Sequence, residues 1–167
     1  GFVLFATTII AKPTPDVEAV ATGNTKFALK LYDELNNEKG NLFLSPYSIS
    51  TALAMTYAGA RGATADEMGR APDFNLPQDR LHSAFSGLKS GLQEISMKGG
   101  VELAIANALW PHKNYPFRQN YIDLIVKNYD SAGQGLDYAN PETARGIINR
   151  WVEKETREKI KDLIPSG

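Results

Sequence analysis

The spacing of hydrophobic and polar residues predicts a chain made mostly of helices. Hydrophobic positions recur every three or four residues over 15–35, 78–97, 117–129 and from 141 to about 152, which is typical of amphipathic helices. A short helix is also expected around 66–70. The run from Ile49 to Tyr57 is hydrophobic almost all round, so we expect that helix to be buried inside a sizeable domain.

A period of two residues follows the helix breakers Gly99 and Gly100. Hydrophobic residues alternate with small or polar ones over 101–109, which predicts a strand covered on both faces. Shorter strands are expected at 43–44 and over 132–138. Helices with a few scattered strands indicate the α+β class.

Several helices carry clear start signals. A polar residue that can cap a helix stands before a proline at the first helical position in three places: Thr14-Pro15, Ser45-Pro46 and Asn140-Pro141. Thr64 and Glu67 have the spacing of a capping box, which predicts another helix start at Thr64.

The composition is that of an ordinary globular protein. A length of 167 residues suggests one domain with a real core, and the net charge is −1 with scattered basic residues. Neither nucleic acid nor an anionic membrane is therefore expected as a partner. Cysteine is absent, which excludes disulfides and thiolate metal sites. No cofactor is predicted.

No arrangement of residues points to catalysis. The two histidines, His82 and His112, are far apart in the sequence, and neither G-x-S-x-G nor H-E-x-x-H occurs. Gly59 and Gly62 are not followed by the Lys-Ser/Thr of a phosphate-binding loop. We expect a protein that is not an enzyme.

The first residues admit two interpretations. The hydrophobic run over 1–11 is too short to span a bilayer, but it suits the remnant of a secretory signal with Ala11 at the cleavage position. An ordinary N-terminal strand is the alternative. Residues 12–23 are expected to form a linker and the start of the first helix, and 24–167 one domain. An extracellular or secreted location is expected, and a cytoplasmic one stays open.

The segment Asn41–Met68 resembles the signature of the serpins, the serine protease inhibitor superfamily. The matching positions are Asn41, Phe43, Ser45, Pro46, Ser48, Ile49, Ala52, Leu53, Met55, Gly59, Ala60, Gly62, Thr64, Glu67 and Met68. Three other segments match in the same order: 24–32, Asn107–Trp110 and 148–164. Two positions depart from the pattern. Glu158 replaces a usual glycine, and Pro72 interrupts a usually aliphatic position.

The resemblance implies a serpin-like α+β fold, of which this chain would hold the N-terminal helices and the first strands of the large sheet. The fold would be incomplete without its C-terminal part. Phe43, Ser45 and Ser48 would belong to the shutter, the region under the main sheet where strands must part. Ile148 and Trp151 would lie on the helix that crosses that sheet. The reading from residues alone makes Ser45 simply an N-cap.

The resemblance also implies a suicide-substrate inhibitor. A reactive loop is cut by a target serine or cysteine protease, and the loop then inserts into the main sheet. That loop is absent from this chain, so the chain itself is expected to inhibit nothing and to self-associate. Two alternatives stay open: a non-inhibitory serpin-like carrier, chaperone or storage protein, and an unrelated helical interaction module.

Overall fold

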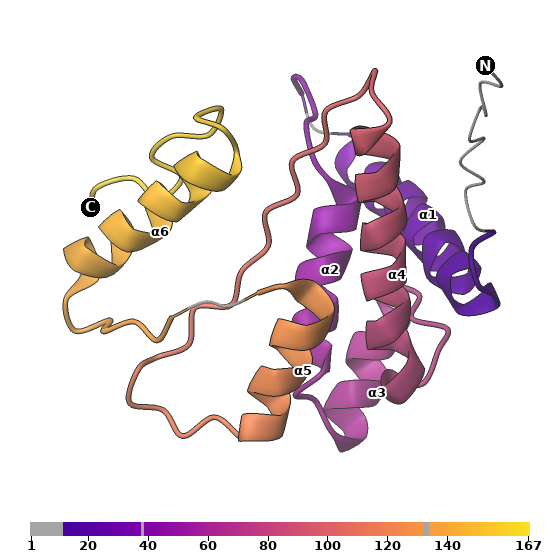
Figure 1. Cartoon of the computed structure of the whole chain (residues 1–167), viewed down its shortest axis with the longest axis horizontal. Helices are drawn as coiled ribbons and strands as arrows, with labels where there is room; N and C mark the ends of the chain where they lie inside the picture. Colours follow the sequence, from indigo (N-terminus) through magenta and orange to yellow (C-terminus); the bar gives the residue numbers. More distant parts are fainter. Residues whose placement is uncertain (1–11, 38, 132–133) are drawn as a thin grey trace, which may run out of the picture.

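A computed structural model describes residues 12–37, 39–131 and 134–167, and Figure 1 shows how they are arranged. The helices are α1 (Pro15–Leu35), α2 (Pro46–Tyr57), α3 (Gly62–Arg70), α4 (Gln78–Met97), α5 (Gln119–Tyr129) and α6 (Pro141–Glu155). Helix α1 packs on α2 and α4, α5 packs on α4, and α3 packs on α2. Helix α6 lies to one side of this group (Figure 1). Within the described ranges, no helix has the length and hydrophobicity that crossing a membrane requires.

One hydrophobic core joins α1, α2, α4 and α5. Phe85 and Leu81 of α4 and Ile125 of α5 are fully enclosed there. Burying a side chain of this size contributes about 1.5–3 kcal/mol, so this core stabilises the packing of the four helices. Its members are Val20, Ala54, Met55, Ala58, Leu81, Ala84, Phe85, Ile125 and Tyr129.

The predicted helix starts are largely confirmed. Thr14 Oγ1 accepts a hydrogen bond from the Val17 amide at 3.4 Å, and Ser45 Oγ accepts one from the Ser48 amide at 3.3 Å. Asn140 occupies the N-cap of α6, although its side chain makes no capping bond. The predicted capping box is wrong, because α3 already begins at Gly62 and therefore holds Thr64 inside the helix.

The helix lengths follow the sequence pattern closely. The predicted bounds 78–97 are those of α4, whereas α5 starts two residues later than predicted, at Gln119. The expected burial of α2 on all sides is wrong, since the Ile49 side chain is 38% exposed. The reason is that α1, α3 and the core side chains of α4 and α5 cover only part of α2, and no sheet covers the rest in the described ranges. Phe117 and Val126 belong to the hydrophobic pattern over 117–129, from which we predict burial, but both are exposed.

The strand expected over 101–109 does not form. Gly99 and Gly100, at φ +89° and +91°, end α4 as predicted, but the following segment has no regular secondary structure. Among the described residues, the backbone of 104–108 makes no hydrogen bond. A strand needs a neighbour to supply its ladder, and the described part of the chain supplies none here.

The two shorter predicted strands do not form regular strands in the described residues either. Residues 43–44 are irregular, so the strand expected there is wrong. Of the strand expected over 132–138, residues 132 and 133 lie outside the described ranges. The rest contributes an isolated parallel bridge between His112 and Leu136, in which the Leu136 amide donates to Pro111 O at 2.8 Å. The helical part of the α+β prediction is therefore observed, and its sheet is not observed in the described residues.

Helix α6 is tied to the segment that follows it. The Asn149 side-chain amide donates to Ile164 O at 2.9 Å, and its Oδ1 accepts from the Ile164 amide at 2.9 Å. Thr156 Oγ1, at the end of the helix, accepts from the Ile160 amide at 3.1 Å. These bonds fold residues 156–164 back along α6, as Figure 1 shows in yellow.

Candidate functional site at the start of α2 and along α6

Ser45 and Ser48 form a pair at the first turn of α2. The Ser45 hydroxyl donates to Ser48 Oγ at 3.0 Å while it accepts from the Ser48 amide. Pro46 sits between them at the first helical position, where its missing N–H leaves no donor unsatisfied. Ser45 is exposed and Ser48 is half-buried. Within the described residues the two hydroxyls thus use each other and leave lone pairs for a further partner.

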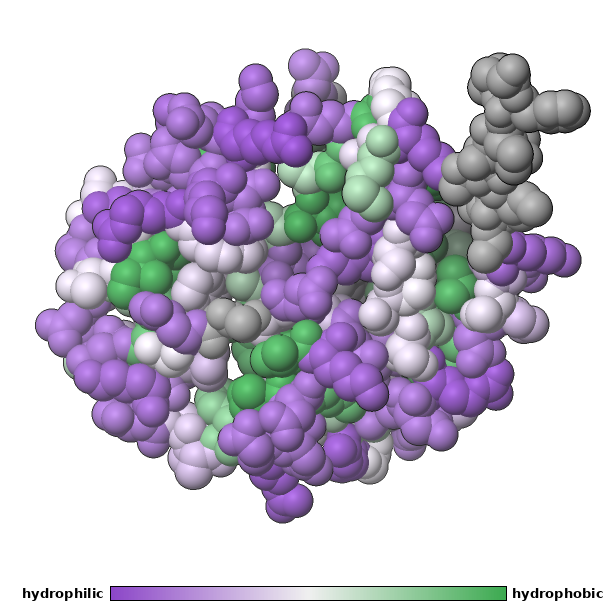
Figure 2. Space-filling view, viewed as in Figure 1, coloured by the Kyte–Doolittle hydropathy of each residue, from purple (hydrophilic) through white to green (hydrophobic). Residues whose placement is uncertain are grey.

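Phe43 is not part of that pair. Its side chain is 100% exposed, and Leu42 beside it is also exposed. A fully exposed phenylalanine is unusual on a folded domain, because burying its ring would stabilise the fold by about 1.5–3 kcal/mol. Figure 2 shows further hydrophobic residues, in green, open on the viewed face.

A cavity of about 270 Å³ lies between α2, α4, α5 and α6 and the 105–107 segment. Tyr47, which lies between the two serines in the sequence, and Thr51 line it from α2, and Trp151 lines it from α6. Asn107 also lines it, and its side-chain nitrogen is buried without a partner in the described residues. A buried donor left unpaired costs about 1–3 kcal/mol. The cavity is therefore lined by an unpaired polar group at the place where the segment 104–108 also lacks backbone partners among the described residues.

Trp151 connects α6 to this segment. Its ring meets that of Trp110 edge to face, with 5.6 Å between centroids. Arg157, just after the helix, forms an ion pair with Glu102 at the other end of the segment. Ile148 is half-buried on the same helix but does not line the cavity. The structure thus brings Trp151 to one cavity with Tyr47 and Thr51 of α2. The other predicted site residues, Phe43, Ser45, Ser48 and Ile148, do not line that cavity.

A buried histidine–tyrosine pair stands behind the cavity. His82 is 2% exposed, and its Nδ1 lies 2.6 Å from the hydroxyl oxygen of Tyr129. Burial, with a smaller effect of the Arg61 charge, lowers the pKa of His82 to about 4. Burial likewise raises the pKa of Tyr129. At neutral pH the pair is therefore an uncharged hydrogen bond.

The burial of two polar side chains, those of Asn107 and His82, was not predicted from the sequence. Asn107 shares the alternating face of Val101, Leu103 and Ile105, where a lone amide among aliphatic residues signals a buried polar position. His82 lies three residues before Phe85, on the flank of the hydrophobic face of α4. A polar residue inside such a stripe needs a buried partner, and Tyr129 could not be identified from spacing.

The geometry offers no catalytic arrangement within the described ranges. His112 Nδ1 accepts a hydrogen bond from the Asn114 amide at 3.1 Å, and His82 Nδ1 is hydrogen-bonded to the Tyr129 hydroxyl. No group of three or more metal-ligating side chains occurs among the residues described. What the arrangement provides is a pair of hydroxyls, a polar cavity and an unpaired stretch of backbone, which together are suited to accept another segment of polypeptide.

Comparison with known proteins shows which family this is. The model of the family described as serpin (serine protease inhibitor) matches residues 22–166. The chain therefore belongs to the serpin family. As a family, serpins are described as protease inhibitors and not as enzymes. The resemblance found in Asn41–Met68 is thereby confirmed.

Curated relatives extend well beyond this chain. It is 37% identical over 154 residues to leukocyte elastase inhibitor of Sus scrofa, covering 90% of this chain and 40% of that protein. It is 35% identical over 168 residues to Serpin B3 of Homo sapiens, covering 90% and 43%. An uncharacterized serpin-like protein of Methanosarcina acetivorans is 38% identical over 149 residues, covering 89% and 34%. The chain thus spans about two fifths of the length of such relatives.

Solved structures place the chain in the same fold. A cleaved kallistatin complexed with heparin superposes with a TM-score of 0.76 at 27% identity, over 89% of this chain and 44% of that one. Cleaved Serpin 42Da gives a TM-score of 0.69 at 28% identity, over 90% and 38%. The serpin-like fold is therefore confirmed for the part that this chain covers.

Proposed function

We propose that the whole protein is a serine-type endopeptidase inhibitor that acts as a suicide substrate. The observation that carries this proposal is the stretch 104–108, whose backbone makes no hydrogen bond among the described residues and which borders the cavity that Trp151 lines. A half-buried backbone without partners is suited to pair with further strands. Inhibitory relatives such as leukocyte elastase inhibitor support protease inhibition as the activity.

The mechanism in this proposal needs a sheet that opens. A reactive loop is cleaved by the target protease, remains acylated to it and enters the main sheet as a new strand, which releases stored strain. Ser45 and Ser48, which still have lone pairs to offer, are the shutter groups that hold the closed sheet. Phe43 is the apolar contact beside them. Trp151 and Ile148 anchor the helix that must yield as the strand enters.

The chain 1–167 alone is expected to inhibit nothing. It contains no segment that we assign as the reactive loop, and its described residues form no sheet for a loop to enter. The partner of the whole protein is a serine or cysteine protease. Secretion belongs to the same proposal, and it rests on the hydrophobic run over 1–11, which lies outside the described residues.

The test is adduct formation. The whole protein is incubated with trypsin-, chymotrypsin- and elastase-like enzymes, and denaturing gels are examined for a covalent complex. We expect an adduct with at least one enzyme and none with the chain 1–167 as the matched control. If the whole protein is only cleaved, without any adduct, the inhibitor proposal fails and a non-inhibitory carrier, chaperone or storage role takes its place. An adduct with the chain 1–167 would contradict the loop-insertion argument.

A further inference from the structure

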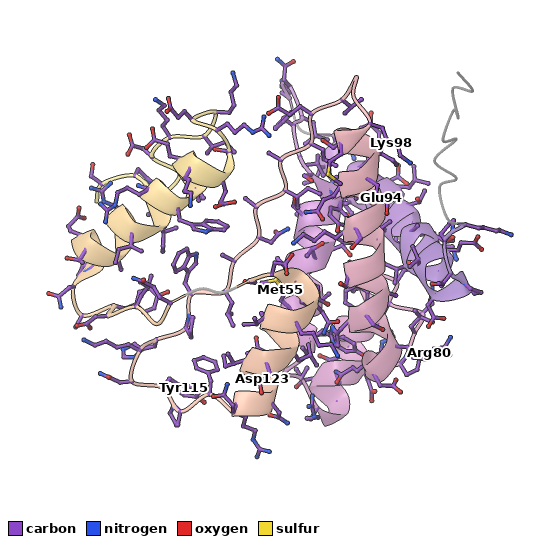
Figure 3. The ribbon with its side chains drawn as sticks, viewed as in Figure 1. Met55, Arg80, Glu94, Lys98, Tyr115 and Asp123 are labelled. Atoms are coloured by element: carbon purple, nitrogen blue, oxygen red, sulfur yellow. The ribbon has the colours of Figure 1, made fainter. Side chains whose placement is uncertain are left out.

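A second hollow lies away from the shutter and the cavity of Trp151. It has a volume of about 580 Å³ and is formed by the end of α2, the turn before α5 and the first turns of α5. The residues that matter here are Gly59, Arg61, Tyr115, Phe117, Arg118 and Tyr121, which we call the α2–α5 groove. Figure 3 shows the turn that carries Tyr115 beside the start of α5. The proposed inhibitory function makes no use of this groove.

Three aromatic rings form one wall of the groove. The ring centroids of Tyr115 and Phe117 are 4.7 Å apart, and Phe117 stacks on Tyr121 at 6.1 Å with 21° between planes. Tyr121 is held in place because its hydroxyl donates to Met55 O at 3.3 Å. Tyr115 is 64% exposed, so an aromatic surface remains open. Such a surface favours a flat ring that can stack on it.

The charge in the groove is positive. Arg61 is fixed, because its Nη1 donates to Ala60 O at 2.6 Å and to Ala58 O at 2.9 Å and contacts Gln78 Oε1 at 3.2 Å. Its Nη2 and Nε make no hydrogen bond in the described residues. Arg118, at the N-cap of α5, forms no ion pair there either.

No carboxylate of the described residues lines the groove. Glu, Asp or a ligand acid would be the natural partner of two guanidinium groups, since their planar forks match a carboxylate.

We propose that the α2–α5 groove binds a small planar aromatic carboxylate. Its ring lies against the wall of Tyr115, Phe117 and Tyr121, where the exposed ring of Tyr115 can stack on it, and the guanidinium groups of Arg118 and Arg61 bind its carboxylate. Concave sites of this size, with aromatic walls and a few fixed polar groups, are the usual form of small-molecule sites. The fixed position of Arg61 lowers the entropy lost when its remaining nitrogens bind an anion.

The test uses 2-naphthoate as the probe and 2-naphthamide as its uncharged counterpart. Binding to the 167-residue chain is measured by ligand-observed saturation-transfer NMR, which tolerates self-association, and affinity is measured by calorimetry. We expect naphthoate to bind at least about tenfold more tightly than naphthamide, because a charge-assisted fork is lost in the amide. Equal binding of both probes, or no binding of naphthoate, would overturn the proposal.

Variants separate the groove from general attraction to a cation. Arg118→Gln should weaken naphthoate about tenfold and leave naphthamide unchanged, and Phe117→Ala should weaken both probes. Lys127→Gln, on the same helix but outside the groove, is the matched control and should change neither. An equal loss with Lys127→Gln and Arg118→Gln would show attraction to net charge only and would contradict the proposal. Circular dichroism confirms that each variant keeps its helices.

Discussion

The imidazole Nδ1 of His82 and the hydroxyl of Tyr129 are joined by a buried hydrogen bond of 2.6 Å that links α4 to α5. The rings meet edge to face, with 5.8 Å between centroids. His82 Nε2 is also buried and has no partner among the described residues. One imidazole nitrogen of His82 is therefore hydrogen-bonded and the other is buried without a partner. A charged imidazolium is disfavoured in these buried surroundings.

Acid should weaken the fold through His82. Its pKa is about 4 in the folded chain, against 6.5 for an ordinary histidine, so only the unfolded chain binds the proton between these values. Stability is then fully present above pH 6.5 and declines as the pH falls toward 4, by at most about 3 kcal/mol. Urea unfolding followed by tryptophan fluorescence at several pH values measures this.

A double variant isolates the pair. His82→Phe with Tyr129→Phe removes both polar groups while keeping rings of similar shape, so the slope between pH 6.5 and 4 should disappear. His112→Gln is the control, because His112 is exposed, and it should keep the slope. A slope that survives in the double variant would show that another group is responsible.

Close packing of α1 should make Gly23 irreplaceable. A Cβ added there would lie 2.6 Å from the backbone oxygen of Asp73, which cannot move aside without shifting the loop after α3. Gly23→Ala is expected to lower the free energy of unfolding by about 1–3 kcal/mol. Gly91→Ala is the matched control within α4, where an added Cβ meets nothing within 4 Å. It should stabilise by about 0.5–1 kcal/mol, because alanine favours a helix interior. Both effects are measured by urea unfolding, and a neutral Gly23→Ala would contradict the observed packing.

The departure at Glu158 should be a point of strain. Its φ is +63°, in the left-handed region that favours glycine, the residue usual at this position in the family. Glu158→Gly is expected to stabilise the segment after α6 by up to about 1 kcal/mol. Lys159→Gly is the control, since Lys159 does not have a positive φ, and it should destabilise. Hydrogen exchange of the Ile160 and Ile164 amides measures both, and faster exchange in Glu158→Gly would contradict the expectation.

The sequence predicted the helices better than the strand, for a physical reason. A helix makes its backbone hydrogen bonds within itself. The hydrophobic spacing over 78–97 and the capping residues Thr14 and Ser45 were therefore sufficient to predict their helices. The alternation over 101–109 specifies a strand only when another strand supplies hydrogen bonds, and the described residues supply none. The capping box failed because Gly62 allowed α3 to start earlier than Thr64. The partner of His82 depended on how α4 and α5 pack, which periodicity does not report.

The chain 1–167 should self-associate. The unpaired backbone of 104–108 and the exposed side chains of Val101 and Leu103 present an open edge to other chains. Light scattering and sedimentation should show oligomers or aggregates. Ala106→Pro removes a donor from the edge and should reduce association, whereas Ala106→Val keeps the donor and should not. A clean monomer that melts cooperatively would contradict this expectation.

Ser48 offers a test of the shutter assignment in the whole protein. In the described residues its hydroxyl accepts from Ser45 Oγ, and its backbone amide donates to the capping Ser45 Oγ independently of the Ser48 side chain. Ser48→Ala therefore keeps the cap, and in the chain 1–167 we expect a loss of only about 0.5 kcal/mol. Under a closed sheet the same change would leave buried partners unpaired, at a cost of about 1–3 kcal/mol.

Under the proposed loop-insertion mechanism the sheet above Ser48 changes its hydrogen bonding, so that cost should fall unequally on the native and the loop-inserted states. We expect more spontaneous insertion or polymerisation, and more cleavage per adduct formed. Lys154→Ala, at an exposed position of α6, is the control and should leave the stoichiometry of inhibition unchanged. The measurements are denaturant unfolding of the native and cleaved forms and titration of protease activity. If Ser48→Ala lowers both stabilities equally and leaves the stoichiometry alone, Ser48 serves only the first turn of α2.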